Sequence, residues 1–274
     1  MTGILYVVGT PIGNLGDMSP RAVEVLKNVD FIAAEDTRVT IKLLNHFEIK
    51  KPMISYFEHN KRERGDIICG RIEQGENCAI VTDAGMPAIS DPGEELVRQC
   101  AQRGIKTLVV PGPTAVLSAL ALSGLPTGRF TFEGFLSMNK KSRREHIEEL
   151  KTERRTMIFY EAPHKLPATL TDLYTAFGDR KIAIVREITK IHEEVIRTTL
   201  KQAAEKYNET PLKGEIVLVI EGCEKPKPKE YTLEEAAKIA QLLVEEGMQQ
   251  TEAAKQAAKE TGLKKGDVYR IMQK

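Results

Sequence analysis

Short apolar runs alternate with helical stretches along most of the 274-residue chain, and this alternation restricts the fold more than any other feature. The runs LYVV at 5–8 and TLVV at 107–110 contain no charged residue, as expected of strands buried on both faces of a sheet. Helical patterns such as Ser19–Asn28 lie between the runs. Strands that alternate with helices of about ten residues are typical of βαβ units. The sequence therefore predicts an α/β fold with mainly parallel pairing.

Two breaks divide this pattern. The segment SGLPTGRF at 123–130 places glycine and proline between two alternating blocks. The segment EGCEKPKPKE at 221–230 is typical of a linker, and three short helical patterns follow it at 233–247, 251–261 and 265–272. We therefore expect two α/β domains, 1–122 and 127–224, and a helical tail at 230–274.

Charge and composition exclude several classes of protein. A net charge of +1 gives no overall field that would attract nucleic acid, so any RNA contact must come from local patches. The four cysteines form no CxxC pair, which predicts reduced, mostly buried thiols and no metal site. The N-terminus has no positive leader or cleavage site, and no apolar stretch approaches the ~20 residues that span a bilayer. We expect a cytoplasmic protein without a membrane segment.

Three turns rich in glycine and proline follow predicted strands: GTPIGN at 9–14, TDAGMPAISDPG at 82–93 and PGPTA at 111–115. Ligands of open α/β sheets bind at this edge, although a single turn of this kind is as often a simple chain reversal. The turns match neither a dinucleotide fingerprint nor a P-loop, which disfavours a nicotinamide dehydrogenase. Asp83 and Asp91 are suited to an amine-bearing ligand or, alternatively, to capping a turn or helix.

Charged segments supply further candidates. In EDTR at 35–38 the carboxylates are suited to orienting a hydroxyl and Arg38 to taking a phosphate; alternatively, they form an N-cap and ion pair for a helix at 39–47. Lys190 and His192 are candidate proton acceptors only if their pKa values are lowered, and the alternative is an exposed charged strand or hairpin. Candidate RNA contacts, each alternatively an ordinary solvated or structural residue, are His59, Asn60, Lys140, Lys141, Arg143, Arg144 and His164.

Five motifs in this order and spacing resemble the ribosomal RNA small-subunit methyltransferase I family of the tetrapyrrole methylase superfamily. They are LYVVGTPIGNLGDMSPRAVEVLKNVDFIAAEDTR, TDAGMPAISDPG, VVPGPTA, FYEAPHK and REITKIHEE, and the resemblance covers Ile4 to about Gly222. It implies S-adenosylmethionine in a cleft between two α/β domains, and a homodimer. The substrate it implies is the 2′-hydroxyl of a cytidine in the decoding region of 16S rRNA, within the small ribosomal subunit.

The resemblance also implies a cofactor pocket. Tyr160, Ile216 and Val217 of the second domain would close over the adenine, and the chain has Met86 and Thr114 where the family pattern often has threonine and serine. The first domain would contribute Thr10, Asp83, Ala84, Gly85, Met86, Ile89, Pro111, Gly112, Thr114 and Ala115.

The chemistry of methyl transfer fits such a pocket. The sulfonium donor is already activated, so positioning and desolvation can supply most of the rate. A 2′-hydroxyl is a weak acid, so a hydrogen-bond acceptor or a local positive field beside it would help. We hypothesise that Glu35 or Asp36, together with Arg38 or Lys190, fills this role.

Two alternatives remain open at this stage. One is a sister methylase that acts on a tetrapyrrole or on a modified protein histidine. The other is an RNA-binding regulator without enzymatic activity. The helical tail, which ends in the basic segment LKKGDVYRIMQK, is suited either to RNA or ribosome recognition or to dimerisation and packing.

Overall fold

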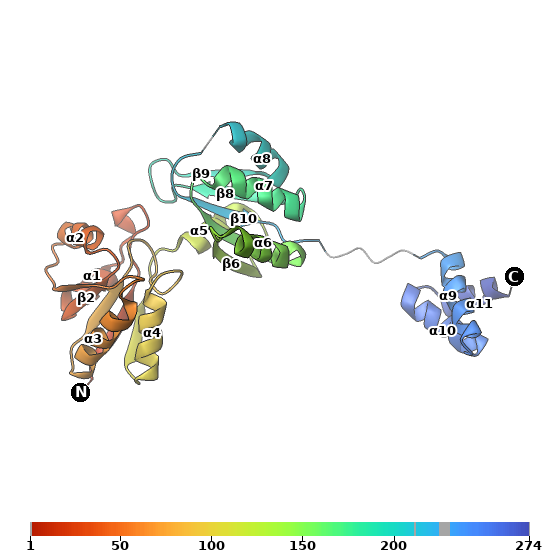
Figure 1. Ribbon diagram of the computed structural model, residues 1–274, viewed down its shortest axis with the longest axis horizontal. Coiled ribbons are helices and arrows are strands. Elements are labelled where there is room, and N and C mark those ends of the chain that lie inside the picture. The colour runs from red at the N-terminus through yellow and green to blue at the C-terminus, as the bar shows by residue number, and fades with distance from the viewer. Residues whose placement is uncertain (1, 211, 225–230, 274) are drawn as a thin grey trace. The chain divides into compact units, whose positions relative to one another are not determined.

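The computed structural model describes residues 2–210, 212–224 and 231–273 and divides into two compact units, 1–223 and 224–274 (Figure 1). The first unit holds two five-stranded sheets with their helices, which confirms the predicted α/β fold. The second unit is helical.

The first sheet has the strand order β3-β2-β4-β1-β5, and every pairing in it is parallel, as predicted. Successive strand residues alternate between two cores, because side chains of a strand point to opposite faces. Helices α3 and α4 cover one core, and α1 and α2 cover the other. The elements are β1 Ile4–Val8, η1 Leu15–Asp17, α1 Pro20–Asn28, β2 Phe31–Ala34, α2 Thr37–His46, β3 Met53–Ser55, α3 Lys61–Glu73, β4 Cys78–Val81, α4 Gly93–Gln102 and β5 Lys106–Val110.

The second sheet differs from the predicted parallel pairing. Its order is β6-β7-β10-β8-β9; only β6 and β7 pair in parallel, and the other three pairings are antiparallel. The expectation of parallel pairing is therefore wrong here, because β8 and β9 form a hairpin and β10 enters between β7 and β8. The elements are β6 Phe130–Phe135, α6 Lys140–Glu149, η2 Leu150–Thr152, β7 Thr156–Glu161, α7 Leu166–Phe177, β8 Lys181–Arg186, β9 Glu194–Thr199, α8 Leu200–Glu209 and β10 Ile216–Ile220.

Three strands were not placed by the sequence analysis. β3 has only three residues, and β6 is interrupted by a register shift between Phe132 and Gly134. The charged β9 was anticipated only as one side of an exposed hairpin, and the hairpin alternative is confirmed. Short, irregular or charged strands lack the apolar signal on which such predictions depend.

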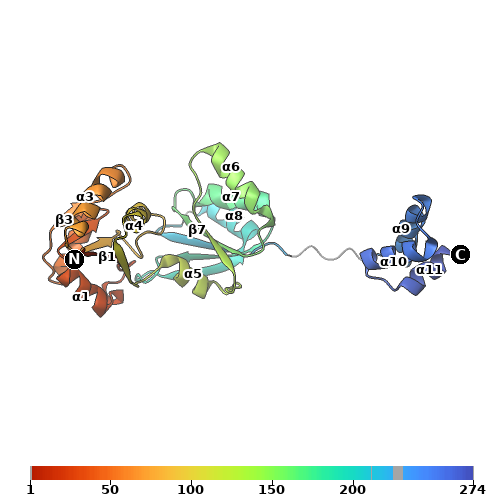
Figure 2. The same ribbon diagram turned by 90° about the horizontal axis from the view of Figure 1, so that it is seen from below.

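Helix α5, Ala115–Ser123, packs against the second sheet although the sequence analysis grouped it with the first domain. Val116, Ala119 and Leu120 share a core with Val185 and Val217. Figure 2 shows α5 on the face of this sheet opposite α6, α7 and α8. Arg197 of β9 donates to the carbonyls of Ser123, at 3.1 Å, and Leu122 at the end of α5. In packing terms the chain passes to the second sheet before α5, and the domain limits 1–122 and 127–224 stay a prediction.

The second unit contains the three helices predicted for the tail: α9 Leu233–Glu245, α10 Gln250–Thr261 and α11 Lys265–Met272. A capping box starts α9, with the side chain of Thr232 bonded to the backbone of Glu235 and the reverse. The core between the helices is mainly alanine, including Ala240, Ala254 and Ala257. Residues 225–230 of the predicted linker, and with them the predicted start of the tail at 230, lie outside the described residues.

Three simpler expectations can be compared with the structure. Cys69, Cys78 and Cys100 are buried free thiols, as predicted, and Cys223 is half-buried. Over the described ranges, no helix combines the length and apolar character that a bilayer crossing requires. Within those same ranges, no three His, Cys, Asp or Glu residues gather in a way that could hold a metal ion.

Candidate functional site

The three glycine-rich turns meet at the carboxyl end of the first sheet, and we call this edge with its turns the rim. A β-carbon built on Gly9 of the first turn would lie 2.7 Å from Cα of Gly112 and 2.7 Å from Sδ of Met86. Thr10 and Gly85 exchange backbone hydrogen bonds of 2.9 and 3.2 Å. The amide of Gly112 donates to the Met86 thioether at 3.3 Å. The turns thus form one close-packed cluster, and glycine is needed where their backbones touch.

The second turn, 82–93, is organised by the Asp91 carboxylate. It accepts hydrogen bonds from the amides of Ala88, Ile89 and Gly93 at 3.0, 3.2 and 2.8 Å. Ala88 and Ser90 have φ of 69° and 64°, so the backbone is held in a conformation that non-glycine residues rarely adopt. Burial raises the pKa of Asp91, while the three amides oppose that rise. The turn alternative for Asp91 is therefore confirmed, whereas the helix-cap alternative is wrong, because Pro92 is the N-cap of α4 and no side-chain hydrogen bond caps that helix.

Two carboxylates connect the ends of β2 and β4. Oε2 of Glu35 accepts from the Thr82 hydroxyl at 2.5 Å and from the amide of Asp83 at 3.4 Å. A second bond runs the other way between the strands: the backbone amide of Asp36 donates to Oδ1 of Asp83 at 3.1 Å. Partial burial raises the pKa of Asp83, and the charge of Glu35 adds to the rise. The sequence analysis treated Glu35 and Asp83 as members of separate motifs, because only the strand order brings 35 and 83 together.

Asp36 caps α2. Its carboxylate accepts from the amide of Arg38 at 2.8 Å and forms an ion pair with the Arg38 guanidinium at 2.6 Å. The side-chain hydrogen bond from Arg38 is the main reason that the pKa of Asp36 falls to about 2. The N-cap and ion-pair alternative is thus what the structure shows. With so low a pKa, Asp36 is a weak proton acceptor.

Lys190 lies in the connection between β8 and β9 and contacts the first turn. Its Cγ is 2.6 Å from the place where a β-carbon on Gly13 would stand. Its Nζ is 3.1 Å from oxygens of both Glu187 and Glu215. Burial alone would lower the pKa of Lys190, but these two carboxylates outweigh burial and raise it. The condition for Lys190 as a proton acceptor is therefore not met, and the residue instead contacts the rim as a protonated amine paired with two carboxylates.

The cofactor candidates differ in exposure. Asp83, Ala84 and Pro111 are exposed, and Ile89 is 56% exposed although apolar. The Thr114 hydroxyl accepts from the amide of Leu117 at 3.1 Å and so caps α5. The remaining first-domain candidates, Thr10, Gly85, Met86, Gly112 and Ala115, are buried or half-buried within the turns or the start of α5.

The second-sheet candidates are Tyr160, Ile216 and Val217. Tyr160 is half-buried, with its ring 5.0 Å from that of Phe132 and 5.4 Å from that of Phe135. Ile216 and Val217 are 3% and 5% exposed, and they belong to cores on opposite faces of the sheet. Of the three, Tyr160 alone offers side-chain surface of any size.

The RNA-contact candidates also separate into two groups. Asn60 accepts from the amide of Phe57 at 2.8 Å and donates to the carbonyl of Ser55 at 3.1 Å, so its side chain shapes the turn before α3. The Arg143 guanidinium bonds Asp172 at 2.8 Å and Thr169 at 2.9 Å, which joins α6 to α7. These two residues have structural partners. The exposed candidates are His59, Lys140, Lys141, Arg144 and His164.

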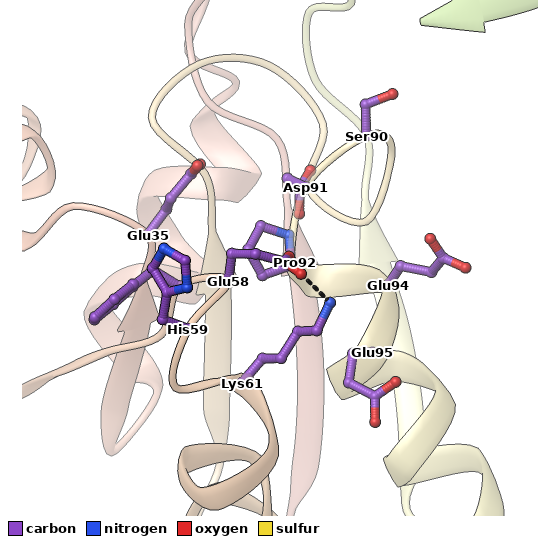
Figure 3. A pocket seen from close by; sticks show the side chains of 10 residues that line it. Glu35, Glu58, His59, Lys61, Ser90, Asp91, Pro92, Glu94 and Glu95 are labelled. Carbon is purple, nitrogen blue, oxygen red and sulfur yellow. Dashed lines mark hydrogen bonds and ion pairs between the residues drawn. The ribbon is translucent and has the colours of Figure 1, made fainter. Parts of the chain in front are cut away.

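A pocket of about 670 Å³ opens on the rim (Figure 3). Glu35 and His59 lie on one side of it, and Ser90, Glu94 and Glu95 lie on the other. The sequence analysis singled out His59, Asn60 and the segment 82–93 but had no means of placing them face to face. The lining residues are Glu35, Phe57, Glu58, His59, Lys61, Ser90, Asp91, Pro92, Glu94 and Glu95.

Comparison with known proteins gives three relevant similarities. Residues 4–204 match the family model of tetrapyrrole (corrin/porphyrin) methylases. A ribosomal RNA small subunit methyltransferase I from Synechocystis sp. is 47% identical over 270 residues, 98% of this chain and 97% of the relative. A relative of the same name from Thermotoga maritima is 46% identical over 222 residues, 81% of this chain and 100% of the relative.

Solved structures share the fold. The uroporphyrin-III C-methyltransferase of Thermus thermophilus, in complex with S-adenyl homocysteine, superposes with a TM-score of 0.54 at 15% sequence identity. The superposition covers 80% of this chain and 92% of that chain. At this identity the similarity concerns the fold alone.

Proposed function

Because this chain belongs to the ribosomal RNA small subunit methyltransferase I family of tetrapyrrole methylases, we propose that it methylates the 2′-hydroxyl of a cytidine in small-subunit rRNA. The observation that carries the proposal is 47% identity over 98% of the chain. Identity at this level extends over both sheets and the helical unit, so it includes every segment that forms the rim.

The rim suits S-adenosylmethionine. The backbone contact between Gly9 and Gly112 leaves a site lined largely by main chain, which can approach a ligand closely. The exposed carboxylate of Asp83 can accept hydrogen bonds from an amine or hydroxyl, and the exposed side chain of Ile89 can pack on an apolar group. When bound, the cofactor supplies an electrophilic methyl group on a sulfonium. We propose that Asp83 to Met86, Ile89 and the third turn hold it, and that Tyr160 contacts its adenine.

The hydrogen bonds of the four catalytic candidates favour different roles. Glu35, Asp36 and Arg38 order the ends of β2, β4 and α2. Lys190 remains protonated because its pKa is raised, and it lies against the first turn. We propose that its charge stabilises the negative charge that develops on the ribose oxygen, a form of electrostatic catalysis that needs no proton acceptor on the chain.

The partner that follows from this proposal is 16S rRNA within the small ribosomal subunit, which places the reaction in the cytoplasm. Because the net charge is only +1, binding would depend on local cations, and Lys140, Lys141 and Arg144 are exposed together at the start of α6. The proposed homodimer rests on the family resemblance.

Mass spectrometry of rRNA tests the function directly. Small-subunit rRNA from cells lacking the protein should miss one ribose methyl on a cytidine, and the wild-type gene should restore it. An unchanged rRNA together with transfer to a tetrapyrrole or to a protein side chain would favour a sister methylase. Calorimetry without measurable affinity for S-adenosylmethionine would favour an RNA-binding regulator.

A further inference from the structure

The pocket on the rim contains none of the residues assigned above to the cofactor. It nevertheless shares the second turn with them, because Ser90 and Asp91 line the pocket while Asp83 to Ile89 form the proposed cofactor side. A ligand in the pocket would therefore lie across one turn from the methyl donor. This position is suited to a part of the substrate rather than to the cofactor.

The charges of the pocket exclude a phosphate group as its ligand. Its lining includes five carboxylates and one lysine, and the ammonium of Lys61 lies 2.5 Å from Glu58. Like charges in a confined, partly desolvated space repel strongly, so an RNA backbone would not enter. Groups that carry N–H donors would be favoured, because carboxylate oxygens only accept hydrogen bonds.

One carboxylate is positioned to accept a hydrogen bond from such a donor. Glu35 uses Oε2 for the Thr82 hydroxyl and the amide of Asp83, so its other oxygen, Oε1, is left for a ligand. Asp91 and Glu95 are held by other partners: three backbone amides bind Asp91, and Arg98 and Gln99 bind Glu95. Glu35 is thus a fixed acceptor at the side of the pocket formed by β2.

An aromatic side chain completes the pocket. Phe57 is 39% exposed, and its ring lies 6.3 Å from that of His59 at nearly a right angle. Asn60 holds the turn in which both rings lie, through its bonds to the amide of Phe57 and the carbonyl of Ser55. Exposed aromatic rings on ordered turns are the usual stacking partners of unpaired nucleobases.

We propose that this pocket takes an unstacked cytosine of the RNA substrate, with Phe57 against the ring and Oε1 of Glu35 accepting from the exocyclic amine. The proposal rests on the proposed function, which it extends by naming the group that is recognised. Cytosine presents an amine donor at the position where uracil presents a carbonyl acceptor. A carboxylate at that position favours cytosine and repels uracil.

Two variants test the proposal through binding of protein-free RNA that contains the decoding region, measured by fluorescence anisotropy. Phe57→Ala should weaken binding about tenfold through lost stacking. Phe130→Ala, which removes a ring of similar exposure, 37%, from outside the pocket, should leave binding unchanged. Unchanged affinity in Phe57→Ala, or an equal loss in both variants, would overturn the proposal.

Glu35→Gln gives the sharper result. The amide oxygen of glutamine can still accept from Thr82, and its NH₂ then replaces Oε1 as a donor. The preference for the natural RNA over one with the target cytidine changed to uridine should fall about tenfold. Glu24→Gln on the exposed surface of α1 is the control. A preference that stays intact in Glu35→Gln contradicts base recognition by this residue.

The outcomes distinguish this proposal from the proposed function. Binding needs no methyl transfer, so a wild-type protein that binds RNA through Phe57 but methylates none supports the pocket and overturns the function. Normal methylation with unaltered RNA binding by both variants overturns the pocket alone. If Phe57→Ala weakens binding to whole small subunits but not to protein-free RNA, a basic ribosomal protein segment occupies the pocket, and the cytosine proposal is wrong.

Discussion

The rim and the C-terminal unit use side chains in opposite ways. In the rim, polar side chains such as Glu35, Thr82 and Asp91 form hydrogen bonds with backbone groups or with neighbouring side chains. These bonds hold the turns in place. In the C-terminal unit, alanines such as Ala240 and Ala254 pack three helices together, and the capping box at Thr232 is local to α9. The first arrangement fixes the geometry of the proposed cofactor site, whereas the second packs three helices around a core of alanines.

The Thermotoga maritima relative makes the contrast informative. Its 222 aligned residues are its full length, and the first unit here spans 223 residues. A protein of the same family thus has a length that the first unit alone would fill. This length agrees with the proposal that the rim of the first unit holds the cofactor.

The largest effect should come from a side chain placed at the backbone contact between the first and third turns. Gly112→Val places a side chain where even a β-carbon would lie 2.8 Å from Cα of Gly9. We expect affinity for S-adenosylmethionine to fall by about 100-fold or more, measured by calorimetry, because both turns must move. Gly70→Ala is the control, because a β-carbon built on Gly70 would have no heavy atom within 4 Å outside its own helix backbone. Wild-type affinity in Gly112→Val would mean that the rim is not the cofactor site.

The next largest effect should come from Lys190. Lys190→Met should lower kcat by about 100-fold, as loss of a transition-state charge partner does elsewhere, with little change in affinity for S-adenosylmethionine. Lys190→Arg should keep most of the activity. Since the pKa of Lys190 is raised from its ordinary 10.5, the ammonium persists below that value and is lost only above it. The ratio of wild-type to Lys190→Met rates should therefore be constant from about pH 6 to about pH 9; a rise with pH would identify a proton acceptor instead.

A smaller effect is expected at Asp91. Asp91→Ala leaves three amides of the second turn without their acceptor, which should raise KM for S-adenosylmethionine about tenfold with kcat nearly unchanged. Asp17→Ala, at an exposed position in η1, is the control. A loss confined to kcat would show that Asp91 acts in the reaction rather than on the turn.

The smallest effect on the cofactor should come from removing the C-terminal unit. A chain that ends after Cys223 should bind S-adenosylmethionine with an affinity within about twofold of the full chain, because the C-terminal unit is a separate compact unit with a core of its own. Calorimetry measures this, and circular dichroism checks the fold. A large loss of affinity would remove the contrast between the two regions.

The sequence predicted the parallel first sheet because apolar runs alternate with helical stretches of about ten residues. The expectation that TLVV is buried on both faces is wrong, because β5 is an edge strand and its Val109 is 51% exposed. It predicted the three turns because glycine and proline mark where β1, β4 and β5 end. It did not predict the pairing of Glu35 with Thr82, the contact between Gly9 and Gly112, or the pocket between 57–61 and 90–95. Each of these depends on strand order and on contacts between distant segments, which no local pattern contains.

The antiparallel pairing of the second sheet escaped prediction for a related reason. Buried strands such as Ile216–Ile220 have the same apolar composition in either direction. The direction of each strand is set by the connections between strands. The sequence analysis gave a hairpin between β8 and β9 only as an alternative to a proton-acceptor site.

The position of β10 has a consequence for synthesis of the chain. It is the last strand to leave the ribosome, yet it lies in the middle of its sheet, between β7 and β8. Until residue 220 has emerged, both neighbours expose unpaired edges, so this half of the protein must wait for its final strand. In the first sheet the inserted strand is β4, which enters between β2 and β1, and the last strand, β5, joins at an edge. The nascent chain therefore completes the rim first and closes the second sheet in a single late step.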